Sequence, residues 1–218
     1  MKQELLEAVH LIISEQTETA TDVLRLKALL DAGININAKI DPKSLDLLQY
    51  DKKGFSLLHL AVMHCKKQMV DVLLASNQAN LQLVDKDGLS ALHMVASYRD
   101  DTQQVLQSEA MLKEKQIAEA IIKHSNAIDL RDKAGNTALH KAAINGNVYV
   151  VELLLKKDYL FPQQKLLSIK NKHGNTVLHE VVQNGKQGKQ ILSLLMRVAS
   201  QQDLEVKNNL YISTSKFI

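Results

Sequence analysis

The segment DKAGNTALHKAAINGNVYVVELLLKK, from Asp132 to Lys157, decides the fold of this chain. It begins with a turn-forming Asp-x-x-Gly motif, in which Gly135 supplies the positive φ or close backbone approach that such a turn needs. Thr137 stands directly before a short apolar segment, where its hydroxyl can accept a hydrogen bond from a free backbone N–H. A longer apolar segment follows from Val148. The pattern predicts a turn, a short helix and a longer helix.

The same pattern occurs three more times. It begins at Asp51 (DKKGFSLLHLAV), Asp85 (DKDGLSALHMVA) and Asn171 (NKHGNTVLHEVV). The glycines and the histidines of the four segments share the same intervals of 34, 47 and 39 residues, and they are Gly54, Gly88, Gly135, Gly174, His59, His93, His140 and His179. Because two residue types share one irregular spacing, the segments are copies of one repeated unit.

These motifs resemble the ankyrin repeat family, whose unit has about 33 residues and a D-x-x-G-x-T-P-L-H core. The segment LLDAGININA, from Leu29 to Ala38, is similar to the end of such a unit and indicates a degenerate first repeat, with helices near Leu5–Ser14 and Asp22–Leu30. The resemblance implies an all-α ankyrin repeat solenoid of stacked helix-turn-helix pairs, about six repeats including degenerate end caps.

We expect a single ankyrin repeat domain over 1–218, with a degenerate repeat at 1–39, clear repeats from about 51, 85, 132 and 171, and a partial cap from about 205. The excess spacing between repeats predicts three insertions. One is near Ile40–Tyr50, one at Asp100–Lys115, expected to extend a second helix at its N-terminus, and one at Asp158–Gln164, expected in a return loop.

Composition excludes several classes of protein. The chain has 218 residues, is 45% hydrophobic and carries a net charge of +3, which is too small for a nucleic-acid-binding surface. Its single cysteine excludes an intramolecular disulfide framework. No apolar run approaches the roughly 20 residues of a membrane span. The first residues lack the unbroken apolar stretch typical of a signal peptide, so we expect none. We expect an intracellular, cytoplasmic monomer, with secretion into a host cell by a non-classical route as the open alternative.

Catalytic and metal-binding motifs are not found in the sequence. The four repeated histidines lie about one repeat apart, whereas metal ligands must share one coordination sphere of about 2 Å radius. In the family this histidine is structural and bonds to the backbone near the turns. No nucleophile elbow, zinc-protease or phosphate-loop motif occurs. We therefore predict no cofactor, no metal and no enzymatic activity.

The resemblance implies that a partner protein binds the face formed by the hairpin tips and the first helices. At the corresponding positions the first two clear repeats carry a predicted exposed apolar patch, and its members are Phe55, Met63, His64, Leu89 and Tyr98. Exposed aromatic and aliphatic side chains are typical of binding hot spots. The alternative is that the insertions at 40–50 and 100–115 cover this patch.

A second candidate surface is a column of lysines at one turn position. Its members are Lys52, Lys86, Lys133 and Lys172. They would suit an acidic protein segment, although lysine is also common at this exposed turn position in the family. The sequence thus predicts a non-catalytic protein–protein interaction module. The alternatives are an inhibitory regulator that masks a transcription factor or enzyme, and a microbial effector that acts on host proteins.

Overall fold

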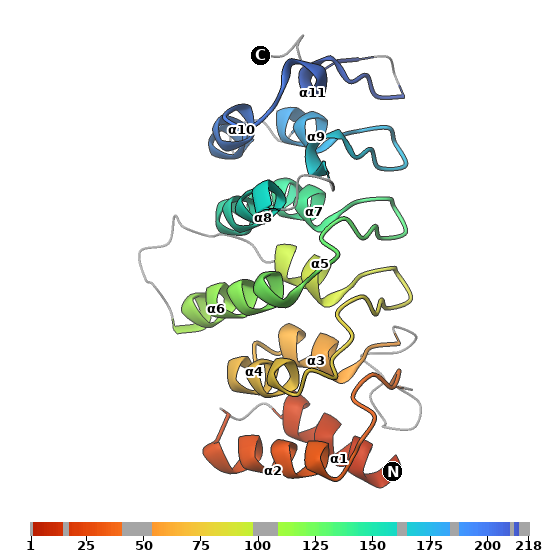
Figure 1. Cartoon of the computed structure of the whole chain (residues 1–218), viewed down its shortest axis with the longest axis vertical. Coiled ribbons are helices and arrows are strands. Elements are labelled where there is room, and N and C mark those ends of the chain that lie inside the picture. The colour runs from red at the N-terminus through yellow and green to blue at the C-terminus, as the bar shows by residue number, and fades with distance from the viewer. Residues whose placement is uncertain are drawn as a thin grey trace. The chain divides into compact units, whose positions relative to one another are not determined.

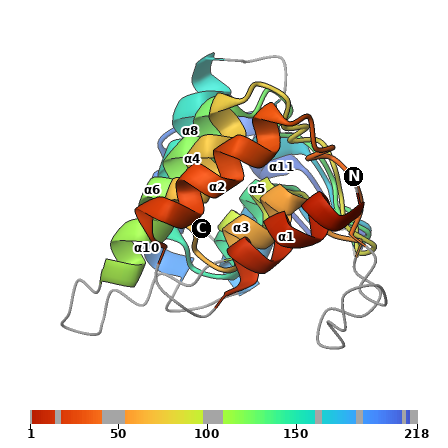
Figure 2. The same cartoon turned by 90° about the horizontal axis from the view of Figure 1, so that it is seen from below.

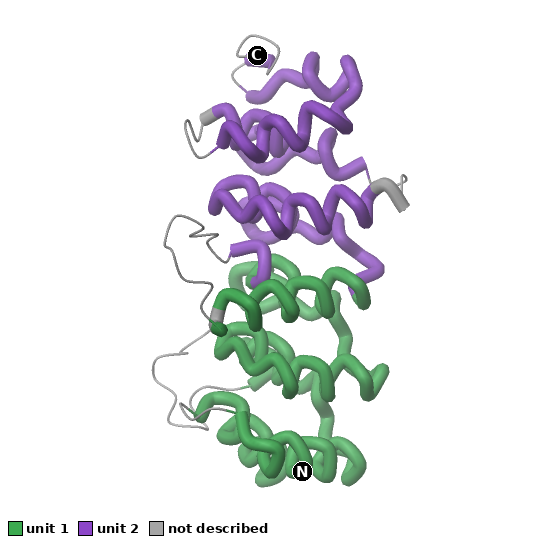
Figure 3. The backbone as a smooth tube through the Cα atoms, turned by 90° about the vertical axis from the view of Figure 1, so that its left-hand side faces the viewer, with its two compact units in different colours: residues 1–94, 107–124 green, residues 95–106, 125–218 purple. Residues whose placement is uncertain are grey.

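The computed structural model of the chain describes residues 2–14, 18–40, 54–97, 109–160, 165–183, 188–209 and 212–213. Helices joined by turns make up most of these residues, and the one extended pairing among them is the bridge between Lys207 and Ser213. The chain divides into two compact units, residues 1–94 with 107–124 and residues 95–106 with 125–218 (Figure 3).

The first unit consists of helix pairs. Its helices are α1 (Lys2–Ile13), α2 (Ala20–Asp31), α3 (Leu57–Met63), α4 (Lys67–Ala75), the start of α5 (Ala91–Ala96) and α6 (Glu109–His124). The first helices pack on each other, α1 against α3, and so do the second helices, with α4 between α2 and α6. Seen from below, α2, α4 and α6 form one row, and α1 and α3 form another (Figure 2).

The second unit repeats this arrangement. Its elements are α7 (Ala138–Ile144), α8 (Val148–Leu160), the short 3-10 helix η3 (Leu166–Ser168), α9 (Val177–Gln183), α10 (Gly188–Met196) and α11 (Gln201–Glu205). Within this unit α7 packs on α9, α8 on α10, and each first helix packs on its own second helix (Figure 1).

The core of each unit is aliphatic. The short first helices contribute much of it, because they are buried along nearly their whole length. In α3, residues 57–62 are all buried, and α7 buries four of its five apolar residues, including Leu139. The second helices contribute residues such as Leu73 and Leu154, which are fully buried. Burying a leucine or isoleucine side chain contributes about 1.5–3 kcal/mol, and such pairs can bury their apolar faces only against neighbouring pairs.

The two helices expected near Leu5–Ser14 and Asp22–Leu30 are present as α1 and α2, while their assignment to a degenerate repeat stays a prediction. The insertion expected at Asp100–Lys115 does extend a second helix over its described residues 109–115, since α6 begins at Glu109 and has 16 residues where α4 has nine. The expectation that 158–164 forms a loop is wrong for residues 158–160, because α8 continues to Leu160. The expected insertion at 41–50, like residues 98–108 and 161–164, lies outside the described residues.

The boundary between the two units falls inside α5, whose residues 91–94 belong to the first unit and 95–96 to the second. A single domain over 1–218 therefore stays a prediction. None of the described helices has both the length and the apolar composition that a membrane span needs.

Candidate partner-binding face

The turns before α5, α7 and α9 are each built by one acidic or amide side chain and one glycine. Asp132 Oδ1 accepts hydrogen bonds from the backbone N–H groups of Ala134 and Asn136, at 2.9 and 2.8 Å. Gly135 follows with a φ of +80°, a left-handed conformation that other residues resist. Asp85 Oδ1 makes the equivalent bonds with Asp87 and Leu89, both at 2.8 Å. The first side chain of each turn therefore stabilises the turn by accepting hydrogen bonds from its backbone N–H groups.

His59, His140 and His179 each join their own turn to a backbone carbonyl further along the chain. His59 Nδ1 accepts from the Ser56 backbone N–H at 3.2 Å, and its Nε2 lies 3.1 Å from the Leu89 carbonyl oxygen. In the second unit, His140 Nε2 lies 3.2 Å from the Asn175 carbonyl oxygen, and His179 Nε2 lies 2.8 Å from that of Ile212. The structural role that the family resemblance implied for these histidines is confirmed.

The hydrogen bonds fix the tautomer of these rings. A backbone N–H can only donate, so Nδ1 must be unprotonated and the proton must reside on Nε2, which donates to the carbonyl. Burial lowers the pKa of His59 and of His140, and the carbonyl acceptors of Leu89 and Asn175 only partly offset this effect. Both rings are therefore held neutral at physiological pH.

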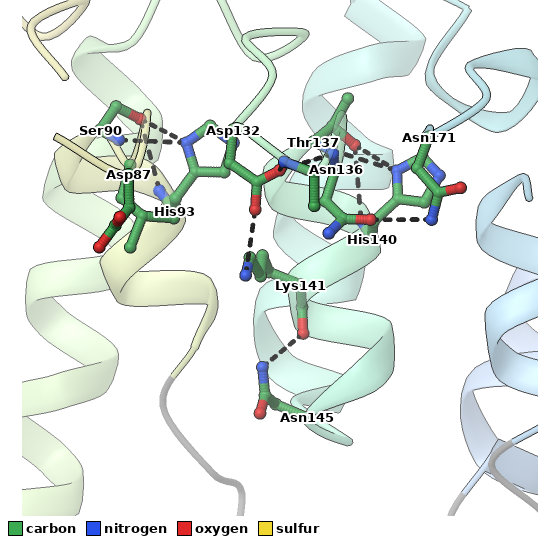
Figure 4. Close-up of polar contacts among 12 residues, drawn as sticks. Asp87, Ser90, His93, Asp132, Asn136, Thr137, His140, Lys141, Asn145 and Asn171 are labelled. Carbon is green, nitrogen blue, oxygen red and sulfur yellow. Dashed lines mark hydrogen bonds and ion pairs between the residues drawn. The ribbon is translucent and has the colours of Figure 1, made fainter. Parts of the chain in front are cut away.

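The second unit uses amides to fill the turn positions that the sequence assigned to the candidate face. Asn171 donates from Nδ2 to Asn136 Oδ1 at 2.9 Å (Figure 4). The same Nδ2 also donates to Glu180 Oε1 at 2.8 Å. Asn175 also donates to Glu180 Oε1, at 3.0 Å, and accepts from Asn208 Nδ2 at the same distance. These buried amides bond to one another and so contribute to the stack.

Lys141 completes the hydrogen bonding of Asp132. Its Nζ lies 3.1 Å from Asp132 Oδ2, and the lysine side chain is 26% exposed where that of the aspartate is 4% exposed (Figure 4). Burial acts to raise the pKa of Asp132, but the backbone N–H of Asn136 and the Lys141 ammonium outweigh it, so the pKa lies below its usual value. Asp132 is thus an ionised carboxylate at neutral pH.

The structure changes the expected apolar patch. Phe55 is only 4% exposed and its backbone carbonyl accepts from Ile40 N–H at 2.7 Å, so its predicted exposure is wrong. The ring lies beside His59 in the core, with the two ring centroids 6.2 Å apart. Met63, His64 and Leu89 are half-buried, while Tyr98 lies outside the described residues. Binding of a partner by these residues stays a prediction.

The lysines of the turn column are exposed where the structure describes them. Lys86 belongs to the first unit, where its side chain and that of Lys39 both approach Gly54. In the second unit, the Lys172 backbone N–H donates to the Ala134 carbonyl at 2.9 Å, which brings its turn against that of Lys133. Lys52 lies outside the described residues. Lys39 is a further exposed lysine beside Lys86. The turn motif does not predict it, because Lys39 precedes the first clear copy of that motif.

Comparison with known proteins agrees with this geometry. A model of ankyrin repeats in three copies matches residues 106–208, and one of ankyrin repeats in many copies matches residues 58–106. The chain belongs to the ankyrin repeat family, whose members generally act as non-catalytic protein–protein interaction modules.

Two curated relatives match about half of the chain. A probable serine/threonine-protein kinase of Dictyostelium discoideum is 29% identical over 114 residues, which are 51% of this chain and 12% of that protein. The nuclear factor NF-kappa-B p105 subunit of Gallus gallus is 29% identical over 107 residues, which are 49% of this chain and 10% of that protein. The match thus covers about a tenth of each relative's length.

Proposed function

We propose that this chain is a non-catalytic module that binds a partner protein through the turns and first helices of its first unit. The observation that supports this most is the contrast at one turn position. Asn136 and Asn175 are buried and bonded to other amides, whereas Leu89 at the same position is apolar and half-buried. Leu89 places apolar area at the surface without contributing a side-chain hydrogen bond to the stack.

The surroundings of Leu89 support a protein partner. Lys86 is exposed in the same turn, and Met63 and Met94 are half-buried on first helices of this unit. Apolar side chains bordered by charged ones are typical of a binding interface, because the apolar centre is desolvated and the charged rim orients the partner. Methionine adapts its shape readily to such a contact. The exposed Lys86 would orient acidic groups of the partner.

A photo-crosslinking experiment tests this proposal. A benzophenone side chain is introduced at Leu89 in one variant and at Leu24, which is 63% exposed on α2, in the control. We expect one protein to crosslink in stoichiometric yield from position 89 and not from position 24. Equal crosslinking from both positions would contradict the proposed face.

The likeness to the NF-kappa-B p105 subunit is compatible with a regulatory role. A second candidate function is therefore an inhibitory regulator that masks a transcription factor or an enzyme. In that case the crosslinked partner loses its own activity in the complex. A partner that keeps its full activity in the crosslinked complex would contradict this second candidate and leave the binding module standing.

A further inference from the structure

The carboxylate of Asp85 is only half satisfied. Asp85 is 5% exposed, and its Oδ1 accepts from Asp87 and Leu89. Its Oδ2 is buried, and the part of the chain that the structure describes places no donor within hydrogen-bonding distance of it. An ionised carboxylate offers about four acceptor positions, and a buried charge without a partner is unfavourable. Asp85 therefore has an unused acceptor.

The equivalent side chains of the second unit, Asp132 and Asn171, have a side-chain partner at this second position. Asp132 makes the same Oδ1 bonds, and Lys141, nine residues later, supplies a cation to Oδ2 at 3.1 Å. Asn171 replaces the carboxylate by an amide, whose Nδ2 donates to Glu180, also nine residues later. The residue nine positions after Asp85 is Met94, which carries no donor. The missing group is thus a side-chain cation at the position of Met94.

The turn before α5 also carries a net negative charge, because its two carboxylates, Asp85 and Asp87, outnumber its one cation, Lys86. The turn DKDG contains a second carboxylate, Asp87, where the two turns of the second unit have Ala134 and His173. Leu89 follows the glycine of this turn and Met94 lies on α5, and both side chains are half-buried. The aliphatic stem of a lysine or arginine can pack on such apolar side chains while its charged end reaches a carboxylate.

We propose that Asp85, with Leu89 and Met94, forms a recognition site for one lysine or arginine side chain of the partner protein. That cation takes the place which Lys141 holds over Asp132 in the second unit. The site rests on the proposed function, since it lies on the turn and first helix of the proposed face. The site adds to the proposed function the requirement that the partner presents one positively charged side chain here.

The first test needs no partner. Met94→Lys supplies the missing cation from within the chain, and Asp85→Asn removes the charge while keeping the side-chain type that Asn171 already uses in this turn. We expect Met94→Lys to raise the Tm by about 2–5 °C in the native background. It should not do so in the Asp85→Asn background, because the gain comes from the pair. Lys141→Met, the matched converse, should lower the Tm.

The second test uses a library of random phage-displayed peptides selected against the intact chain. We expect the selected peptides to share a lysine or arginine, and its replacement by glutamine to weaken binding about tenfold or more. Asp85→Asn and Met94→Lys in the chain should weaken the same peptides to a similar extent. Lys141→Gln is the control and should leave the affinity within about twofold.

Several outcomes would overturn the site. One is a Tm change on Met94→Lys that is the same with and without the Asp85 charge, and another is peptides that bind Asp85→Asn as tightly as the native chain. If such peptides still lose affinity on Leu89→Gln, only the basic-residue site fails and the proposed face stands. If no peptide is selected, or if Leu89→Gln changes nothing, the proposed function fails with it.

Discussion

The imidazole rings of His59, His140 and His179 each connect two parts of the backbone. This connection depends on the ring being neutral. In His59 and His140 the Nδ1 atom accepts from a backbone N–H, at 3.2 and 3.3 Å. A proton on Nδ1 would face that N–H and remove the bond. The repeated histidine, which the sequence spacing identifies, is therefore also expected to make the stability of the fold depend on pH.

We predict that the stability of the chain falls as the pH is lowered from 7.5 to 5. Burial lowers the pKa of His59 and His140 in the folded chain, whereas the unfolded chain takes up these protons near pH 6.5. The stabilisation is thus complete above pH 6.5 and is lost as the pH falls toward the folded pKa, with a slope of at most about 1.4 kcal/mol per pH unit for each histidine. Urea unfolding at several pH values measures this slope.

His140→Gln is the control for this prediction, because it removes one titrating ring. The variant is less stable at every pH, but its dependence on pH should be shallower than that of the native chain. Asp132 does not interfere, since its pKa lies below its usual value and it stays ionised over this range. A free energy of unfolding that is constant from pH 7.5 to 5 would contradict the neutral-histidine account.

Two glycines of the second unit separate backbone strain from steric contact. Gly146 has a φ of +73° with open space where a Cβ would lie, so Gly146→Ala should cost about 1 kcal/mol of strain alone. At Gly135 the φ is +80° and a Cβ would lie 2.9 Å from the Lys172 backbone nitrogen. Gly135→Ala should therefore cost at least about 1 kcal/mol more. Equal urea midpoints for the two variants would refute the close approach of these turns.

At the scale of the helices, the sequence predicts their number and order better than their ends. The periodic leucines and the Ser/Thr N-caps place α3 and α7 correctly, because these signals are local. The extension of α6 to Glu109 follows from its helical composition. The end of α8 was misplaced because Pro162 suggested a loop, yet a proline disfavours the helix only from the residue before it. Helical bonding up to Leu160 is compatible with that proline.

The N-terminus of α4 is capped by a side chain that lies about 50 residues earlier in the sequence, so no local sequence motif predicts this cap. The Glu18 carboxylate accepts from the backbone N–H groups of Met69 and Gln68, at 3.0 and 3.3 Å. A carboxylate at a helix N-terminus satisfies free donors and interacts favourably with the helix dipole. We predict that Glu18→Ala destabilises the chain by about 1 kcal/mol in thermal or urea unfolding. Asp31→Ala, at the C-terminal end of α2, is the control and should cost nothing.

At the scale of the whole molecule, the fold follows from the repeats, whereas the candidate face follows only in part. The turns and histidines repeat, so one clear copy predicts the others. The exposure of a turn side chain instead depends on residues about 35 positions away, as with Asn136 and Asn171. Phe55 was predicted at the surface and is buried beside His59, while Met94, which occupies the position equivalent to Lys141, was overlooked.

The most direct test of the proposed function starts from the partner that crosslinking identifies. The affinity of this free partner is measured for two double variants of the chain. Met63→Gln with Leu89→Gln removes apolar area from the proposed face without changing the charge. Leu24→Gln with Leu112→Gln makes the same change on the exposed second helices α2 and α6. By titration calorimetry, the first pair should weaken binding at least tenfold, or about 1.4 kcal/mol, and the second pair should not. Equal affinities for the two pairs would contradict partner binding by the turns and first helices.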